Sequence, residues 1–302
     1  MNTLHRLNWL RSAIVCLLAA LPTAVFGYES ETHQQLTFVA VKQFSRCAQE
    51  FIEIDQPSAL DTRYVVRANV AQAEGNFFVR MFRWNYYNRA DEENRSAVWM
   101  IDTRFHDHFN GLTTDLVEDQ ERRQRLRTFG RILSYLQDVT SPAHVVPVFT
   151  SRWWRLSFSD RFDRFPLDVD GIESALNEFC DTLPELAPNF DALLTNTAAD
   201  TIQGVRSKIT GFPTTWESYW EFAKDSDEFG EYGPAGNQFG RRTRFSCGNR
   251  DKCLLLENDP LYQAFAMERH ITAVKSTIHA MMLMQVLERR RANAEPLDLN
   301  AD

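Results

Sequence analysis

The stretch Phe129-Gly-Arg-Ile-Leu-Ser-Tyr-Leu-Gln-Asp-Val-Thr-Ser-Pro-Ala-His-Val-Val-Pro-Val148 decides how the rest of the chain is interpreted. Apolar residues in it and just before it fall at helical spacing and predict one apolar helix face: Leu126, Phe129, Leu133 and Leu136. Pro142 disfavours helical geometry at the preceding residue, so the helix should end near Ser141. That ending would fold His144 back toward Asp138. A carboxylate and an imidazole that converge at the end of a buried helix are typical of metal sites in helical bundles.

The second half of this stretch carries a family resemblance. Leu136-Gln-Asp-Val-Thr-Ser-Pro-Ala-His144 resembles the signature of the zinc-dependent phospholipase C / P1 nuclease superfamily, in its bacterial phospholipase C-like branch. In that signature one histidine lies four residues before the aspartate and another lies six residues after it. Asp138 and His144 match, whereas Ser134 stands where the first histidine is expected. The resemblance implies an all-α, multi-helix bundle in which three zinc ions serve phosphodiester hydrolysis.

The first 27 residues have the pattern of a secretory signal peptide. Arg6 and Arg11 supply the positive start, an apolar run follows at 13–20, and Val25-Phe-Gly27 suits cleavage. A membrane anchor is the weaker alternative, because the run is short and Pro22 interrupts it. We therefore expect a secreted or periplasmic protein. Its mature part would be one helical domain over 28–292, followed by a flexible tail at 293–302.

Charge and cysteine content limit the possible functions further. Removal of Arg6 and Arg11 takes the formal net charge from −8 to −10, which disfavours binding to nucleic acid. Four cysteines remain, an even number that suggests two disulfides in an exported chain. Cys247 and Cys253 are close in sequence and are expected to pair, which leaves Cys47–Cys180 as the long-range bridge.

Cleavage after Gly27 would make Tyr28 the first residue of the mature chain. A helix is expected from Ser30, with its apolar positions at Leu36, Val39, Ala40 and Phe44. In the resembling family the terminal residue binds zinc through its own amine and carbonyl, and a histidine soon follows. Tyr28 and His33 match that arrangement. The alternative is that His33 is a surface histidine near a helix start.

Two alignments with the family are open between Tyr64 and Phe109. In the first, Asn85 replaces a histidine ligand, and Gly75 or Asn76 replaces an aspartate. In the second, an acidic phrase at 90–94 and His108 keep both ligands. The spacing favours the first, because Asn85 lies 49 residues before Ser134 whereas His108 lies only 26 before it. His106 or His108 would then lie on a following helix, from which one of them could still reach the site.

A last ligand phrase is expected around Ser159-Asp-Arg-Phe-Asp163, where Ser159 stands in place of a histidine. Because a serine hydroxyl is a weak zinc ligand, these substitutions predict a reduced site with one or more zinc ions. The resemblance assigns catalytic roles to Asp138 and Asp163. It implies metal ligands at Tyr28, His33, His108, Asp138, His144 and Asp163, and substituted ligand positions at Asn85, Ser134 and Ser159.

The function expected from the sequence is hydrolysis of phospholipids or other phosphodiesters by an exported phospholipase C-like enzyme, with contact to a membrane surface. The alternative is a catalytically silent relative that binds a lipid, a metal or a partner protein. A nuclease is third, because the chain is acidic. A serine hydrolase built on Ser134 or Ser141 is fourth, because no Gly-x-Ser-x-Gly motif is present.

Three other segments carry expectations. The aromatic and glycine-rich segment 212–240 is expected to be a lid, a pocket wall or a disulfide-pinned surface loop. The charged segments 115–127 and 289–291 are expected to be solvated. A last helix should start at Asp259-Pro260, with its apolar face formed by Met267, Ile271, Val274, Ile278 and Met281.

Overall fold

A computed structural model of the chain describes residues 28–50, 55–74, 87, 106–146, 148, 160–180, 187–224, 230–248 and 251–294. Most of these residues are helical, in the order α2 (Ser30–Glu50), α3 (Ala59–Ala73), α5 (His106–Glu118), α6 (Arg122–Asp138), α7 (Pro142–Val145), α8 (Val169–Ala175), α9 (Phe190–Arg206) and α10 (Pro260–Ala294). The predicted predominance of helix is confirmed. None of these helices has the length and hydropathy that crossing a lipid bilayer requires. The expected leader at 1–27 and most of the expected tail lie outside the described residues.

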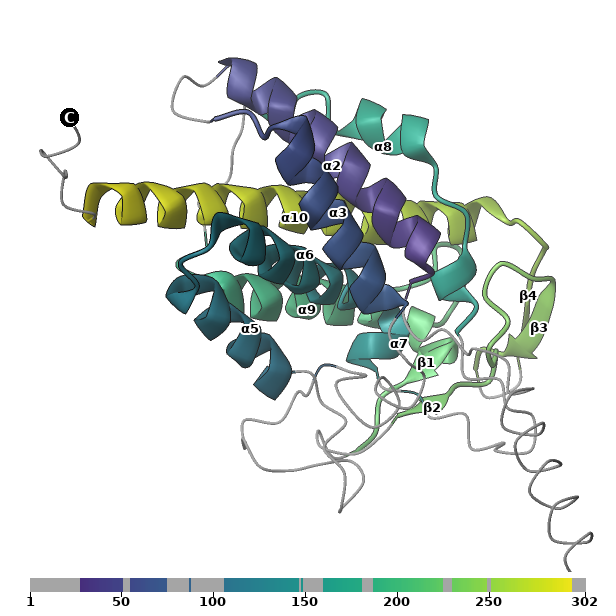
Figure 1. Ribbon diagram of the computed structural model, residues 1–302. Coiled ribbons are helices and arrows are strands. Elements are labelled where there is room, and N and C mark those ends of the chain that lie inside the picture. The colour runs from purple at the N-terminus through teal and green to yellow at the C-terminus, as the bar shows by residue number, and fades with distance from the viewer. Residues whose placement is uncertain are drawn as a thin grey trace, which may run out of the picture.

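Helix α6 lies at the centre and contacts α3, α5, α9 and α10 (Figure 1). Its predicted apolar face is confirmed, because Leu126, Phe129, Leu133 and Leu136 are all buried. Gly130 brings α3 unusually close to α6. A Cβ atom at Gly130 would lie 2.3 Å from the carbonyl oxygen of Val65, so no larger residue fits without a shift of backbone. The same close approach sets Asn69 of α3 against α6.

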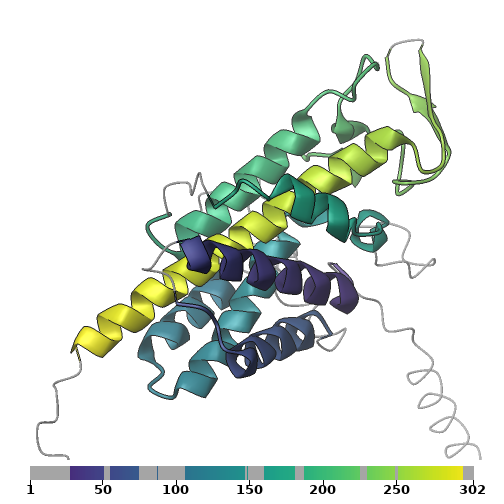
Figure 2. The ribbon, with the colours of Figure 1, turned by 90° about the horizontal axis from the view of Figure 1, so that it is seen from above.

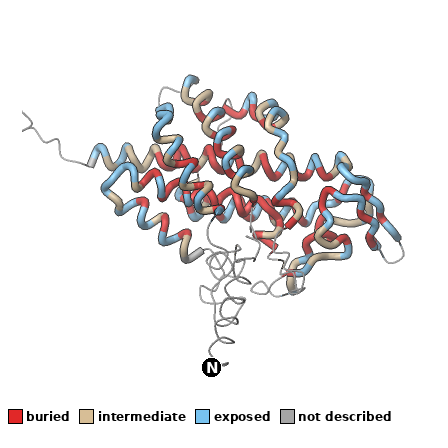
Figure 3. Tube along the Cα trace, turned by 45° about the vertical axis from the view of Figure 1, so that its right-hand side comes forward, coloured by how far each residue is buried: buried red, intermediate tan, exposed pale blue. Residues whose placement is uncertain are grey.

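Helix α10 extends along the whole domain, from the strands at one side to the C-terminal side (Figure 1). Its 35 residues correspond to about 52 Å of helix. It starts at Pro260 as predicted, and Oδ1 of Asp259 accepts a hydrogen bond from the amide of Leu261 at 3.0 Å. Helix α2 crosses it in the view from above (Figure 2). The buried residues lie where the helices face one another, with exposed residues on the outside (Figure 3).

Two disulfides stabilise this arrangement, and both are the pairs predicted from the sequence. Cys47–Cys180 links α2 to the turn after α8, and Cys247–Cys253 closes a hairpin. That hairpin is the antiparallel pair β3 (Thr243–Ser246) and β4 (Lys252–Leu255). A second antiparallel pair is β1 (Trp220–Glu221) with β2 (Glu231–Tyr232).

The aromatic segment before β3 belongs to the core. Trp216, Trp220 and Phe239 are buried, so the surface-loop expectation is wrong for these residues. The ring of Trp216 lies 4.5 Å from that of Phe265 on α10, between centroids. The ring of Phe239 lies 5.2 Å from Phe162, which begins the short 3₁₀ helix η2 (Phe162–Arg164). Another 3₁₀ turn, η3 (Trp216–Ser218), starts the segment. The aromatic content of this segment therefore extends the hydrophobic core along α10.

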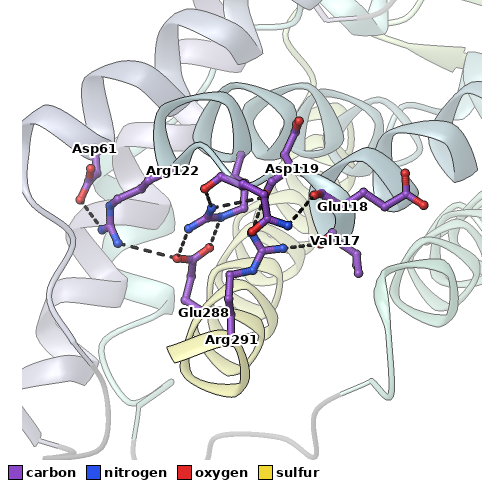
Figure 4. Close-up of polar contacts among 9 residues, drawn as sticks. Asp61, Val117, Glu118, Asp119, Arg122, Glu288 and Arg291 are labelled. Atoms are coloured by element: carbon purple, nitrogen blue, oxygen red, sulfur yellow. Dashed lines mark hydrogen bonds and ion pairs between the residues drawn. The ribbon is translucent and has the colours of Figure 1, made fainter. Parts of the chain in front are cut away.

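The two charged segments expected to be solvated meet at the start of α6 (Figure 4). Arg125 is buried and donates from Nε and Nη2 to the two carboxylate oxygens of Glu288, at 2.6 and 2.8 Å. Arg122 pairs with Asp61 at 2.9 Å, and Arg291 donates to two carbonyl oxygens at the end of α5. We call Asp61, Arg122, Arg125, Glu288 and Arg291 the arginine network. Most charged residues of the two segments are exposed, as expected, but Arg125 is buried. The expectation of a frayed end is wrong for 289–291, because α10 continues to Ala294 and the network joins α3, α5, α6 and α10.

Candidate functional site

The end of α6 has the geometry that its proline predicts. The helix ends at Asp138, and Ser141 is extended, with φ −82° and ψ 128°. Pro142 then takes the first position of α7, where its missing amide proton costs nothing. His144 follows in a buried position. The sequence therefore predicts the local path of the chain into the site correctly.

Gln137 holds a buried hydrogen-bond network at this end of α6. Its Nε2 donates to the hydroxyl oxygens of Thr37 and Thr277, at 2.9 and 3.2 Å. Its Oε1 accepts from Nδ2 of Asn69 at 3.1 Å and lies 2.7 Å from Nδ1 of His33. We call His33, Thr37, Asn69, Gln137 and Thr277 the glutamine network. It connects α2, α3 and α10 to the last turn of α6.

The partners of Gln137 fix the protonation of His33. The hydroxyl of Thr277 donates to the carbonyl of Ala273 at 2.8 Å, so its oxygen is left to accept from Gln137. This places the Gln137 amide nitrogen toward the threonines and its oxygen toward His33. A carbonyl oxygen only accepts, so Nδ1 of His33 must carry a proton. The network thus holds one defined tautomer and orientation of the imidazole.

The other ring nitrogen of His33 faces a carboxylate. Nε2 lies 3.2 Å from Oδ1 of Asp138, and it makes no hydrogen bond among the described residues. Two electron-rich atoms this close need a positive charge between them, either a proton or a cation. Two ligands on one tetrahedral zinc ion lie roughly 3.3 Å apart. The spacing of Nε2 and Oδ1 therefore fits a pair of ligands on a single cation.

Tyr28 is locked beside this pair. Its ring is fully buried and lies 5.9 Å from the His33 ring and 5.6 Å from the His270 ring, between centroids. Its hydroxyl and that of Thr140 are hydrogen bonded at 3.1 Å. Burial raises the pKa of the phenol above its ordinary value, and the carboxylates of Asp163 and Asp138 add to this shift. Tyr28 is therefore a neutral anchor that fixes the beginning of the domain against His33.

Asp163 and Asp160 lie on the turn at η2 and form the acidic side of the site. Oδ1 of Asp163 accepts a hydrogen bond from Oγ of Ser141 at 2.6 Å. Asp160 is buried and accepts hydrogen bonds from Trp220 Nε1 at 2.9 Å and from the Tyr232 hydroxyl at 2.8 Å. Burial raises the pKa of Asp160, although these hydrogen bonds and the nearby His144 oppose the rise. His144 therefore has Asp160 as an electrostatic partner.

The structure brings together some of the residues that the sequence singled out. Tyr28, His33 and Asp138 are neighbours, and Asp163 influences Tyr28 electrostatically. The ring of His108 lies 5.8 Å from that of Tyr135 on α6. Among the described residues no three side chains of histidine, cysteine, aspartate or glutamate gather closely enough to hold a metal ion. The expected substituted positions Asn85 and Ser159 lie outside the described residues.

Ser134 occupies the position where the resemblance expects a histidine. It is buried, and its Oγ has no hydrogen-bond partner in the described part of the chain. An unsatisfied buried hydroxyl is uncommon in folded proteins and often marks a functional position. Here it lies one turn before Asp138, so it belongs to the same end of α6.

Sequence reasoning missed Asp160, Asn69 and Gln137. Asp160 lies next to the expected ligand phrase, but its partners Trp220 and Tyr232 are 60 and 72 residues away. Gln137 lies inside the quoted signature, beside Asp138, and a glutamine at a buried helical position was the available signal.

Comparison of the chain with protein-family models, with curated proteins and with solved structures gave no significant match.

Proposed function

We propose that this protein is an exported phosphodiester hydrolase of the phospholipase C type, with a reduced metal site at Tyr28, His33 and Asp138. The observation that carries the proposal is the 3.2 Å approach of His33 Nε2 to Asp138 Oδ1, with Nδ1 of the same ring held by Gln137. Metal-binding histidines usually direct their second nitrogen to a hydrogen-bond acceptor in this way. The two disulfides support an oxidising compartment.

The donor set supports one cation better than three. Imidazole and carboxylate are suitable zinc ligands, and the amine and carbonyl of Tyr28 would add two donors after cleavage of a leader. Ser134 offers a neutral hydroxyl where a further imidazole would be needed, and the described residues hold no group of three ligand side chains. Among the described residues, His33, Asp138 and the backbone of Tyr28 therefore support a proposal of one zinc ion rather than three.

A bound zinc ion would supply a Lewis acid and activate water at neutral pH, which is what phosphodiester hydrolysis needs. Residues of this chain would position the ligands of the ion and transfer protons near it. Gln137 keeps the proton of His33 on Nδ1 and presents Nε2 to the site. Ser141 holds the carboxylate of Asp163 in place at 2.6 Å. We assign proton transfer to the leaving group to His144, which is buried and interacts electrostatically with Asp160.

The acidic character of the chain favours a lipid over a nucleic acid as the substrate. A formal net charge of −8 repels a polyanion, whereas a single phosphodiester can be held by a local cation. We therefore place phospholipids first among the substrates, with contact to a membrane surface during turnover.

A catalytically silent binding protein is the second candidate, and one observation favours it. His33 is fully buried, and Asp138 and His144 are nearly so. A site of this kind can be retained for stability or for binding a metal or a lipid after turnover has been lost.

The deciding experiment is elemental analysis of the mature protein after dialysis without chelator. We expect about one zinc ion per chain. His33→Ala and Asp138→Asn should each lose it and should lose hydrolysis of phosphatidylcholine. His279→Ala is the control and should keep both, because its ring packs against Phe179 and belongs to neither the metal site nor the glutamine network. Two or more zinc ions would indicate that His106 or His108 contributes, and no zinc would leave the binding protein as the better proposal.

A further inference from the structure

A polar cavity lies on the side of the η2 turn that faces away from the candidate site. It has a volume of about 460 Å³. Acidic and basic side chains of this turn lie on opposite sides. Asp160, Phe162 and Asp163 are buried toward the candidate site, whereas Arg161 and Arg164 line the outer cavity. The opposite wall comes from the loop before β3 and from the turn before α10, with Asn237, Gln238, Phe239, Gly240, Arg241, Glu257 and Asn258.

The cavity concentrates positive charge in an acidic protein. Three arginines line it, Arg161, Arg164 and Arg241, against one carboxylate, Glu257. The three guanidinium groups share this one cavity, so their like charges repel one another. An oxyanion bound among them would offset that repulsion.

The existing partners of the arginines leave room for a ligand. Nε of Arg161 donates to the carbonyl of Phe239 at 3.2 Å, and its two terminal nitrogens make no hydrogen bond among the described residues. Arg241 pairs with Glu257 at 3.3 Å and Arg164 with Glu29 at 3.0 Å, all with exposed side chains. Exposed pairs of this kind contribute little, so an anion can compete for these arginines.

The walls of the cavity are held in place before any ligand arrives. The amide of Arg161 donates to Oδ1 of Asn237 at 2.8 Å, and the amide of Asn258 donates to the carbonyl of Gly240 at 3.2 Å. Gly240 has φ +80°, and a Cβ atom there would lie 3.0 Å from the ring of Phe165. The loop is therefore fixed by a conformation that suits glycine, which reduces the ordering cost of binding.

We propose that Arg161, Arg164 and Arg241 form a binding site for an oxyanion of the phosphate class, either a small soluble phosphate or the phosphate of a lipid headgroup. Guanidinium groups suit this ligand because each offers two parallel N–H donors to phosphate oxygens. The site is separate from the proposed metal site, and its occupation does not depend on whether that site binds zinc.

Calorimetric titration of the exported protein with inorganic phosphate at low ionic strength tests the proposal. We expect saturable binding that weakens as salt is added. Arg161→Gln and Arg241→Gln should each weaken it about fivefold or more. Glu257→Gln should strengthen it about threefold, because the competing carboxylate is lost. Arg244→Gln, an exposed β3 residue outside the cavity, is the matched control and should change nothing.

A second arm distinguishes the two sources of the phosphate. Sedimentation is measured with phosphatidylcholine vesicles, with and without phosphatidylglycerol. Binding to the anionic vesicles that Arg241→Gln abolishes would identify a headgroup, and phosphate binding alone would identify a soluble ligand. Absence of both, or equal affinity in the natural chain and in all three cavity variants, would overturn the proposal. Zinc content should be the same in these variants, which separates this result from the test of the metal site.

Discussion

The two ends of α6 handle charge in different ways. The charges at both ends are unfavourable for the helix dipole. The first turn carries Arg122 and Arg125 and no acidic residue, whereas the last turn ends with Asp138 and has no basic residue. At the start, Glu288 and Asp61 neutralise Arg125 and Arg122 through short hydrogen-bonded pairs (Figure 4). At the end, His33 Nε2 lies 3.2 Å from Asp138 Oδ1 and makes no hydrogen bond within the part of the chain that the structure describes.

We propose from this difference that the start of α6 is structural and that its end is functional. In the arginine network, ion pairs and hydrogen bonds satisfy the charges that the helix start brings together. The glutamine network is equally well bonded around Gln137, yet it leaves His33 Nε2 and Ser134 Oγ without hydrogen bonds in the described part of the chain. Buried polar atoms left in this way tend to occur where a protein binds something. Four predictions test whether the two ends of α6 differ in this way.

Arg125→Met should have the largest effect on stability. The change removes a buried guanidinium that bonds both oxygens of Glu288 and the carbonyl of Gln120. We expect the free energy of unfolding in urea to fall by about 3 kcal/mol. Zinc content should stay unchanged, because this end of α6 is structural. Arg127→Met on the exposed face is the control. A loss as small as that of the control would show that the network contributes little.

Gln137→Leu should cost about 2 kcal/mol, because Nδ1 of His33 and Nδ2 of Asn69 would lose their shared acceptor. It should also weaken zinc binding about tenfold or more, since His33 would no longer be oriented. Urea unfolding and a zinc titration measure the two effects. Gln124→Leu, near the start of the same helix, should change neither. Unchanged zinc affinity in Gln137→Leu would contradict the functional assignment of this end.

Acid should weaken the arginine network. The hydrogen bond from Arg125 is the main reason that the pKa of Glu288 lies below its ordinary value of 4.5, although burial opposes this shift. A carboxylate with a lowered folded pKa stabilises the protein above its unfolded pKa, and this contribution is lost as the pH falls through the folded pKa. The difference in unfolding free energy between the natural chain and Glu288→Gln should therefore be full at pH 7 and shrink below about pH 4.5. A constant difference down to pH 3 would rule this out.

Ser134→Ala should have the smallest effect. Its Oγ has no hydrogen-bond partner among the described residues, so its removal should leave stability within about 0.5 kcal/mol or raise it slightly. Ser276→Ala is the matched control, because this buried helical serine shares a 2.8 Å hydrogen bond with Thr197. It should lose about 1 kcal/mol. Equal losses in the two variants would mean that Ser134 has a partner after all.

Local patterns predicted much of the fold. The apolar spacing of Leu126, Phe129, Leu133 and Leu136 identified the buried face of α6, and Pro142 predicted where the helix ends. The start of α10 at Pro260 and both disulfides were also predicted. Of the residues that the sequence assigned to the candidate site, Tyr28, His33 and Asp138 are neighbours, and His144 interacts electrostatically with Asp160. Their role in binding a metal stays a prediction.

Sequence patterns predicted the buried face and the end of α6, the start of α10 and the cysteine pairs, because periodicity, proline geometry and the spacing of cysteines act over a few residues. The tertiary structure alone decided which polar residues are buried and what each one bonds. Gln137 reaches His33 and Thr277 across 104 and 140 residues, and Arg125 reaches Glu288 across 163. In an isolated helix these side chains would look solvated. They form a network and a candidate site only because distant helices bring donors and acceptors to the two ends of α6. Removal from water then strengthens each hydrogen bond, because the dielectric constant inside the protein is lower.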